Sequence, residues 1–385
     1  MNKCILFGLA LNVLVVRGEN WKDPASGILW RFAIEKDEAI VTHAEPCEGS
    51  LVVPDSLGGC RVVGVYDQAF KNSRNLTSVK ILPGVNNIGR EAFSGCSHLS
   101  SISIPPSVTN IANGAFAGCE ELGNGVVIVD GCVLTVNGSC PSVVNLPPGT
   151  RLIAGGAFKN HTELASVVIP EGVMYVGDYA FYGCAGLVSV AIPSSVGELG
   201  DAVFSGCSGL CDENGFTIVR GIMYGYYGKD RAISIPSGVI RIGSSACAEC
   251  VSLTSVCVPL SVKRIGGSAF AGCYNLTELT ISEGLEEVGT EAFVACSRLQ
   301  TVKIPNGVKK IGDYAFAYCD GLSSLVIPDS VGHIGSHAFY SCDELGSGVV
   351  IIDSCVVAVN GDCPEEVSLP DGTIAPAMNY IDSAA

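Results

Sequence analysis

The sequence predicts a repeat solenoid built from 23-residue coils, each with a β-strand and a short helical turn, and with three inserted β-hairpins. Three observations predict this fold. Ala-Phe pairs recur at a step of 23 residues, a Cys follows most of them by three residues, and the spacing of apolar residues changes within each unit from three to two. A fixed period of about 20 to 50 residues is the signature of stacked repeats.

The Ala-Phe period runs through most of the chain. The pairs end at Phe70, Phe93, Phe116, Phe158, Phe181, Phe270, Phe293, Phe316 and Phe339, with Phe204 and Cys247 in the same place. The step widens to 42 residues after Phe116 and to 43 after Phe204. We therefore expect hairpin insertions near residues 123–150 and 211–236, and a third near 346–370 because its sequence resembles the first.

One unit shows how the pattern becomes structure. Phe93 and Cys96 are three residues apart, which places both side chains on one face of a tight helical turn. Ile102 and Ile104 are two apart, as in a strand with one buried face. Pro105 ends that strand by removing a hydrogen-bond donor. A single coil cannot bury these apolar groups, so the coils must stack. Most of the 47 glycines are expected at coil corners that need a positive φ.

The ends of the chain lack the repeat. Residues 1–18 contain Lys3 and an apolar run that is short for a membrane span, so we expect a signal peptide; a buried first strand is the alternative. Residues 19–65 contain both tryptophans and are expected to cap the first coil. The solenoid is predicted over residues 66–370. Residues 371–385 are expected to form a tail or a truncated cap.

Two segments carry a family resemblance: "IGREAFSGCSHLSSISIPPSVTNI" and "IGDYAFAYCDGLSSLVIPDSVGHIG". They resemble the BspA-like leucine-rich repeats of bacterial and protist surface proteins, and the likeness recurs in eleven units between residue 50 and about residue 370. The departures are Cys247 in place of Phe, His161 and Ser73 in place of Cys, and Ser282 in place of Pro. The resemblance implies a leucine-rich-repeat-like fold and adhesion-like roles.

Nine of the 19 cysteines share one place in the repeat: Cys96, Cys119, Cys184, Cys207, Cys250, Cys273, Cys296, Cys319 and Cys342. Stacking would align them about 4.8 Å apart. Parallel side chains at that spacing disfavour disulfides, and the absence of a converging His disfavours a metal site. We interpret them as small buried apolar residues.

Two hairpin insertions match closely and hold two cysteines each, Cys132 with Cys140 and Cys355 with Cys363. An Asn-Gly turn signal lies inside each pair, at 137–138 and 360–361. The third hairpin has Ile222 and Asp230 in the two places, so both cysteines are present or both absent. This pattern predicts a disulfide within each pair and an oxidising compartment. Cys47 and Cys60 in the cap are a further candidate pair.

The sequence argues against catalysis and against nucleic-acid binding. The net charge is −16, whereas nucleic acids and anionic membranes attract an excess of Lys and Arg. His333 and His337 are four residues apart but are separated by a predicted corner. No catalytic or phosphate-binding motif is present. We therefore expect no enzyme activity, no metal and no cofactor.

Candidate ligand contacts are few. The predicted strand face carries small side chains and lacks the aromatic and Arg anchors of strong interfaces. The best local candidates are three tyrosines of the middle hairpin and two basic pairs that flank Glu286-Glu287 in the stack: Tyr224, Tyr226, Tyr227, Lys263, Arg264, Lys309 and Lys310. For the basic pairs we favour a charge ladder between neighbouring coils over a ligand site.

These features together predict a non-catalytic repeat scaffold, secreted or displayed on a cell surface, that binds proteins or glycans in an adhesin-like manner. The alternative is a structural protein that self-associates through its solenoid ends. No transmembrane segment is expected, because no apolar run reaches about 18 residues.

Overall fold

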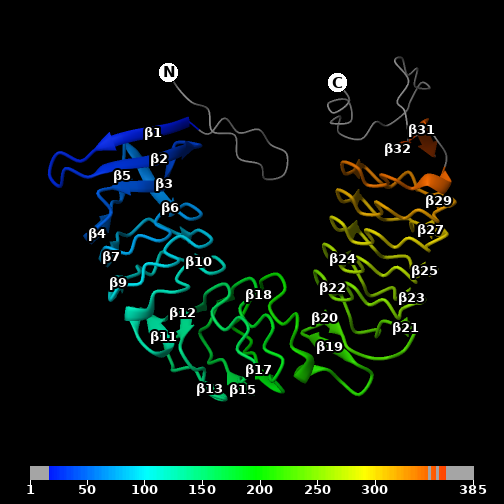
Figure 1. The fold of residues 1–385 in the computed structure, drawn as a ribbon, viewed down its shortest axis with the longest axis horizontal. Coiled ribbons are helices and arrows are strands. Elements are labelled where there is room, and N and C mark those ends of the chain that lie inside the picture. The colour runs from blue at the N-terminus through cyan, green and yellow to red at the C-terminus, as the bar shows by residue number, and fades with distance from the viewer. Residues whose placement is uncertain (1–16, 346–347, 353–354, 361–385) are drawn as a thin grey trace. The chain divides into compact units, whose positions relative to one another are not determined.

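The computed structural model describes residues 17–345, 348–352 and 355–360 and confirms the repeat solenoid. The chain divides into two compact units, Met1–Phe204 and Ser205–Ala385. Within each unit short parallel strands stack as successive rungs (Figure 1). The predicted signal peptide, except for its last two residues, and the predicted tail lie outside the described residues.

The N-terminal unit begins with an antiparallel sheet. Its strands are β1 (Arg17–Lys22), β2 (Leu29–Glu35) and β3 (Glu38–Glu45). β3 then pairs in parallel with β6 (Cys60–Val65), which also pairs with β5 (Ser56–Leu57), and β8 (Asn87–Ile88) and β10 (Asn110–Ile111) continue the stack. Trp30 and Phe32 are buried at this end. A second sheet contains β4 (Gly49–Val53), β7 (Leu76–Ile81) and β9 (Ser101–Ser103).

The first hairpin interrupts this stack. It consists of β11 (Gly125–Val129) and β12 (Cys132–Asn137), after a short 3₁₀ helix at Glu120–Leu122. β12 joins the parallel strands β14 (Leu152–Ile153), β16 (Tyr175–Val176) and β18 (Glu198–Leu199). The other face of these coils carries β13 (Val143–Asn145), β15 (Ser166–Val168) and β17 (Ser189–Ala191).

The C-terminal unit repeats this plan. After a 3₁₀ helix at Ser208–Leu210, β19 (Phe216–Val219) and β20 (Ile222–Tyr226) form the second hairpin. One sheet continues through β22 (Arg241–Ile242), β24 (Arg264–Ile265), β26 (Glu287–Val288), β28 (Lys310–Ile311) and β30 (His333–Ile334). The opposite face carries β21 (Ala232–Ser234), β23 (Ser255–Val258), β25 (Glu278–Ile281), β27 (Thr301–Lys303) and β29 (Ser324–Val326). A 3₁₀ helix at Asp343–Leu345 precedes the third hairpin, β31 (Gly348–Ile352) and β32 (Cys355–Asn360).

The core of most coils is a phenylalanine beside a cysteine. Phe93 and Phe116 are fully buried, and their parallel ring centroids lie 5.3 Å apart. The Cys96 thiol donates a hydrogen bond to the Phe70 carbonyl of the preceding coil at 3.1 Å. Six further column cysteines make the same bond to the preceding coil at 3.0–3.3 Å: Cys119, Cys184, Cys273, Cys296, Cys319 and Cys342. The column cysteine therefore fills space in the apolar core and also donates a hydrogen bond to the preceding coil.

The predicted helical turn is present in a reduced form. The backbone amide of Cys96 donates to the Phe93 carbonyl at 3.2 Å, and that of Leu99 to Cys96 at 3.0 Å. These are successive three-residue turns, as the spacing of the apolar residues predicts. Within the described residues a 3₁₀ helix forms only at the three places that precede the hairpins.

The predicted hairpin turn and disulfide at Cys132 and Cys140 are wrong. The turn is at Asp130-Gly131, where φ is +49° and +74°, and not at Asn137-Gly138. Cys132 therefore begins β12, a strand about 17 Å long, whereas Cys140 follows its far end. A disulfide needs Cα atoms within about 7 Å. Both thiols are free and buried.

The other two predicted cysteine pairs have different outcomes. Cys355 begins β32 in the matching register, and Cys363 lies outside the described residues, so that bridge stays a prediction. Cys47 and Cys60 are free and partly exposed. Cys47 lies beside Ser73, where a hydrogen bond from that hydroxyl opposes the rise that burial causes in the thiol pKa. The predicted Cys47–Cys60 pair is therefore not formed.

The prediction that corner glycines need a positive φ holds for one corner of the coil and fails for the other. Gly95 and Gly272 follow their Phe by two residues and have φ of +74° and +70°. The Ile-Gly or Val-Gly corners instead have ordinary φ and lie against the preceding coil: a Cβ on Gly289 would lie 2.7 Å from the carbonyl carbon of Gly266. The left-handed residue of that corner is two positions later and is not always Gly, as at Glu291, with φ +57°.

Candidate ligand-binding surface

The tyrosines of the second hairpin are divided between the core and the surface. Tyr224 and Tyr226 are 2% and 5% exposed, and the Tyr226 ring packs on Phe216 with centroids 5.0 Å apart. The Tyr226 hydroxyl accepts a hydrogen bond from the backbone amide of Asp230 at 3.0 Å. Tyr227 is 40% exposed. Of the three predicted contacts, Tyr227 is therefore the accessible one.

The basic pairs belong to a charge ladder. Arg264, Glu287 and Lys310 are in register on β24, β26 and β28, and the Lys310 ammonium lies 3.2 Å from the Glu287 carboxylate. The Lys263 ammonium donates to the Gly284 carbonyl at 3.2 Å, whereas Lys309 is exposed. Opposite charges on adjacent strands stabilise their pairing. The favoured interpretation of these residues as a ladder is thus confirmed at Glu287 and Lys310.

We expect Glu287→Lys to lower the free energy of unfolding by about 1 kcal/mol, because three basic side chains would then face one another on adjacent strands. Glu278→Lys makes the same charge change on β25, where the neighbour in register is the uncharged Ser255, and should have a smaller effect. Urea denaturation at low and at high salt measures both. An equal effect of the two variants, or no reduction of the difference by salt, would contradict the ladder.

A shallow polar groove crosses three coils of the C-terminal unit. Its volume is about 500 Å³, and it is lined by Thr277, Ser297, Arg298, Gln300, Gly321, Ser323 and Glu344. Apart from Ser297, the lining comes from two columns of the repeat, each with a step of 23 residues. Thr277, Gln300 and Ser323 immediately precede β25, β27 and β29, whereas Arg298, Gly321 and Glu344 occupy the corner before them.

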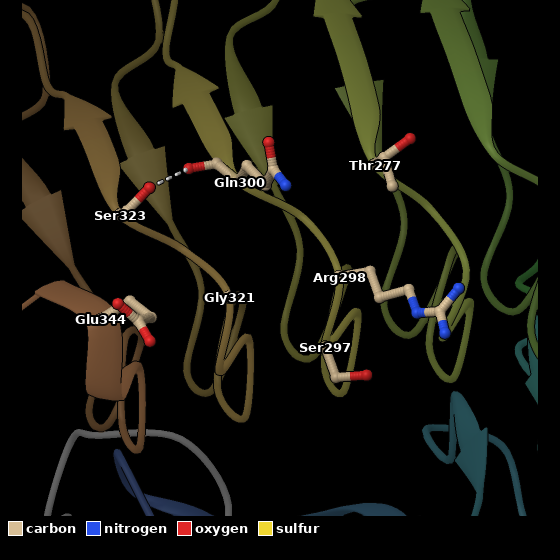
Figure 2. A pocket seen from close by; sticks show the side chains of 7 residues that line it. All are labelled: Thr277, Ser297, Arg298, Gln300, Gly321, Ser323 and Glu344. Carbon is tan, nitrogen blue, oxygen red and sulfur yellow. Dashed lines mark hydrogen bonds between the residues drawn. The ribbon is translucent and has the colours of Figure 1, made fainter.

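Gly321 forms the floor of the groove. A Cβ at this position would lie 2.9 Å from the Ser297 carbonyl oxygen, so the corner is closely packed against the preceding coil. Because Gly321 has no side chain, the column is hollow between its two charged neighbours. Figure 2 shows Arg298 extended toward the coil of Thr277 and Glu344 at the opposite end of the groove.

The groove has a charged side chain at each end. Among the described residues, neither the Arg298 guanidinium nor the Glu344 carboxylate has an ion-pair partner, and both residues are exposed. They are two coil steps apart, about 10 Å. Between them the Ser323 hydroxyl donates to the backbone carbonyl of Gln300 at 3.4 Å, and the side-chain amide of Gln300 lines the groove (Figure 2). The groove thus offers a cation, an amide and a carboxylate in a row.

Among the described residues, the column cysteines and the pair His333 and His337 do not form a metal site. Burial raises the pKa of the Cys296 and Cys119 thiols to about 12, which keeps these column cysteines protonated. His333 is exposed on β30, whereas the His337 ring stacks on Tyr314 with centroids 4.9 Å apart. No group of three metal-ligating side chains comes together in the described part of the chain.

One pair of side chains was missed by sequence reasoning. Cys250 was assigned to the column and Cys247 to a substituted Phe, although the string Cys247-Ala248-Glu249-Cys250 is itself a C-x-x-C motif. The structure places the two cysteines at the ends of one tight turn, in which the Cys250 backbone amide donates to the Cys247 carbonyl at 3.2 Å. The motif was the signal that could have identified this pair.

Known proteins were compared with the chain. A solved leucine-rich cell surface protein from Faecalibacterium prausnitzii A2-165 is 28% identical, with 85% of this chain and 93% of that chain covered and a TM-score of 0.44. A leucine-rich repeat protein from T. pallidum is 32% identical, covers 50% of this chain and 92% of its own, and has a TM-score of 0.33. No match was found among curated proteins.

The described helices are all short 3₁₀ turns, and none is long and apolar enough to cross a membrane. The family model of the BspA type leucine-rich repeat region matches residues 62–128, 137–216 and 223–346 in six copies. This match covers more than half of the sequence, and it includes the coils that form the groove. The chain therefore belongs to the family of BspA-type leucine-rich repeat proteins.

Proposed function

We propose that this protein is a secreted or cell-surface scaffold that binds a protein or glycan ligand without catalysis, in an adhesin-like manner. The polar groove between Arg298 and Glu344 is the observation that carries the proposal. Its donors and acceptors are exposed, and they are held by rigid stacked coils. An extended ligand such as a glycan chain or a peptide strand has hydrogen-bonding groups at several positions along its length, and these match a row of polar side chains better than one deep pocket does.

Two further observations support surface binding. The F. prausnitzii protein that resembles this chain is described as a cell surface protein. Exposed aromatic side chains also gather near the groove's last coils: Tyr318 and Tyr340 are 46% and 39% exposed, with ring centroids 5.5 Å apart. Tyrosine is enriched at binding surfaces because its rigid ring buries a large area at low entropic cost.

An array of extracellular-matrix proteins and glycans tests the proposal. We expect the fluorescently labelled protein to bind at least one class, and the double variant Arg298→Ala/Gln300→Ala to bind at least about tenfold more weakly. Lys303→Ala is the matched control, since Lys303 is exposed on the same coil but does not line the groove. Complete absence of hits contradicts the proposal, and equal losses in both variants would exclude the groove as the site.

Self-association through the solenoid ends is the second candidate function. β1 lies at the end of its sheet, and no described residue pairs with its outer edge. An open edge strand is a template for pairing with another chain. Light scattering of the free protein over a range of concentrations therefore accompanies the array. A monomer mass at every concentration would eliminate this alternative and leave ligand binding as the function under test.

A further inference from the structure

The C-x-x-C motif forms a tight turn in the first full coil after the second hairpin. The backbone amide of Cys250 donates to the Cys247 carbonyl at 3.2 Å, and Glu249 between them has φ +58°. The ends of such a turn lie within about 7 Å of each other. This is close to the range of Cα separations, about 4.4–6.8 Å, that a disulfide accepts. Unlike Cys132 and Cys140, these two cysteines therefore meet the geometric requirement for a bridge.

The two cysteines are unequal in exposure. Cys247 is 1% exposed, in a position that holds a buried Phe in the neighbouring coils. Cys250 is partly exposed. Its sulfur is 3.9 Å from the Tyr226 carbonyl, a longer contact than the 3.0–3.3 Å of the other column cysteines. Cys250 is thus the column cysteine that is partly exposed and has a long hydrogen bond to the preceding coil.

The surroundings of the two thiols also set their acidities apart. The hydrogen bond from Cys247 lowers the pKa of Cys250, whereas the same bond together with burial raises the pKa of Cys247. The thiolate is the nucleophile in disulfide exchange, so an exposed sulfur with a stabilised thiolate reacts first and a buried neighbour resolves the intermediate.

We propose that Cys247 and Cys250 form a redox-active dithiol that is oxidised to an intramolecular disulfide by exchange with a low-molecular-weight disulfide. The Cys250 thiolate attacks one sulfur of the oxidant, breaks its S–S bond and releases one thiolate. Cys247 then attacks the Cys250 sulfur in the mixed disulfide and releases the second thiolate, which takes up the Cys247 proton. The two cysteines lose two electrons and two protons in total, and the oxidant becomes two thiols.

Glutathione disulfide is the probe for this site. The reduced full-length protein is equilibrated with mixtures of glutathione and glutathione disulfide, quenched in acid, alkylated after denaturation and digested with trypsin. The peptide of residues 242–263 contains Cys247, Cys250 and Cys257. We expect it to lose two of its three alkyl groups in oxidising mixtures, whereas the peptide with Cys296 stays alkylated. Retention of all three groups in every mixture would overturn the proposal.

Two comparisons separate a folded site from the general tendency of C-x-x-C to oxidise. The same titration in urea should need at least about tenfold more glutathione disulfide, because only the folded turn holds the two cysteines close together. Equal titrations in both states would contradict the proposal. Cys247→Phe restores the residue that the neighbouring coils carry, so it should fold. It should accumulate a mixed disulfide with glutathione at Cys250, and an unmodified Cys250 in that variant would also count against the mechanism.

Discussion

Phe293→Ala is expected to lower the free energy of unfolding by about 3–5 kcal/mol, the range for truncation of a fully buried Phe. Phe293 is 0% exposed, and its ring lies between those of Phe270 and Phe316 at centroid distances of 5.1 Å and 5.0 Å. The rings are nearly parallel, with interplanar angles of 4° and 6°. Removal of one ring therefore leaves a cavity that faces both neighbouring coils.

The position of the cavity should also reduce the cooperativity of unfolding. In a solenoid, stability is the sum of coil terms and nearest-neighbour interface terms. Phe293→Ala weakens two interfaces at once, so the coils on either side should lose cooperativity. Urea denaturation followed by circular dichroism measures the free energy, and amide hydrogen exchange reports on the separate coils.

Tyr318→Ala is the control for loss of an aromatic ring, since Tyr318 lies two residues after Phe316 but is 46% exposed. It should cost less than about 1 kcal/mol, as substitutions away from buried features usually do. If Phe293→Ala were no more damaging than Tyr318→Ala, the phenylalanine stack would not be the main stabilising feature of the coils.

The repeat could be predicted in detail because each coil has the same local requirement. The spacing of three from Phe93 to Cys96, and of two from Ile102 to Ile104, corresponds to observed turns and to β9. Stacked coils must also share a register, so one correct unit fixes its neighbours. The ladder at Glu287 and Lys310 follows from this register alone.

The turn of the first hairpin was placed wrongly because the segment contains two competing turn signals. Asp130-Gly131 and Asn137-Gly138 both suit a two-residue hairpin turn. The structure uses the first, and Asn137 instead ends β12, where its side-chain amide donates to the carbonyls of Cys119 and Gly123 at 2.9 Å and 3.0 Å. The second hairpin also turns at its earlier signal, Arg220-Gly221, where φ is +50° and +75°. The turn does not form at Asn137-Gly138 because the Asn137 side chain is buried and holds these two carbonyls.

The groove was not predicted because no single coil contains it. Arg298, Gly321 and Glu344 are 23 residues apart in succession, and each is unremarkable in its own unit. The groove exists because Gly321 has no side chain, whereas the residues before and after it in this column, Arg298 and Glu344, have long ones. These residues precede the strands, so the alternation of the strand positions does not indicate them. Alignment of corner positions across coils would have revealed the pattern.

Gly289→Ala is expected to destabilise the protein by about 1–3 kcal/mol or more, although it adds a single methyl group. The added Cβ would lie 2.7 Å from the carbonyl carbon of Gly266 and 2.8 Å from the amide nitrogen of Gly267. Backbone atoms of a stacked coil cannot rotate away as a side chain can. The coil of Gly289 would have to move away from the preceding one, which lengthens the hydrogen bond from the Gly289 amide to the Ile265 carbonyl, now 2.8 Å.

Gly238→Ala is the matched control for this substitution. It makes the same chemical change in the same unit, and a Cβ at Gly238 would meet nothing within 4 Å. Its effect should be close to zero or slightly stabilising, because alanine restricts the unfolded chain more than glycine does. Thermal and urea denaturation of the two variants test whether close approach of the coils is the reason for these corner glycines. Equal losses of stability would mean that the close contact between coils does not explain their recurrence.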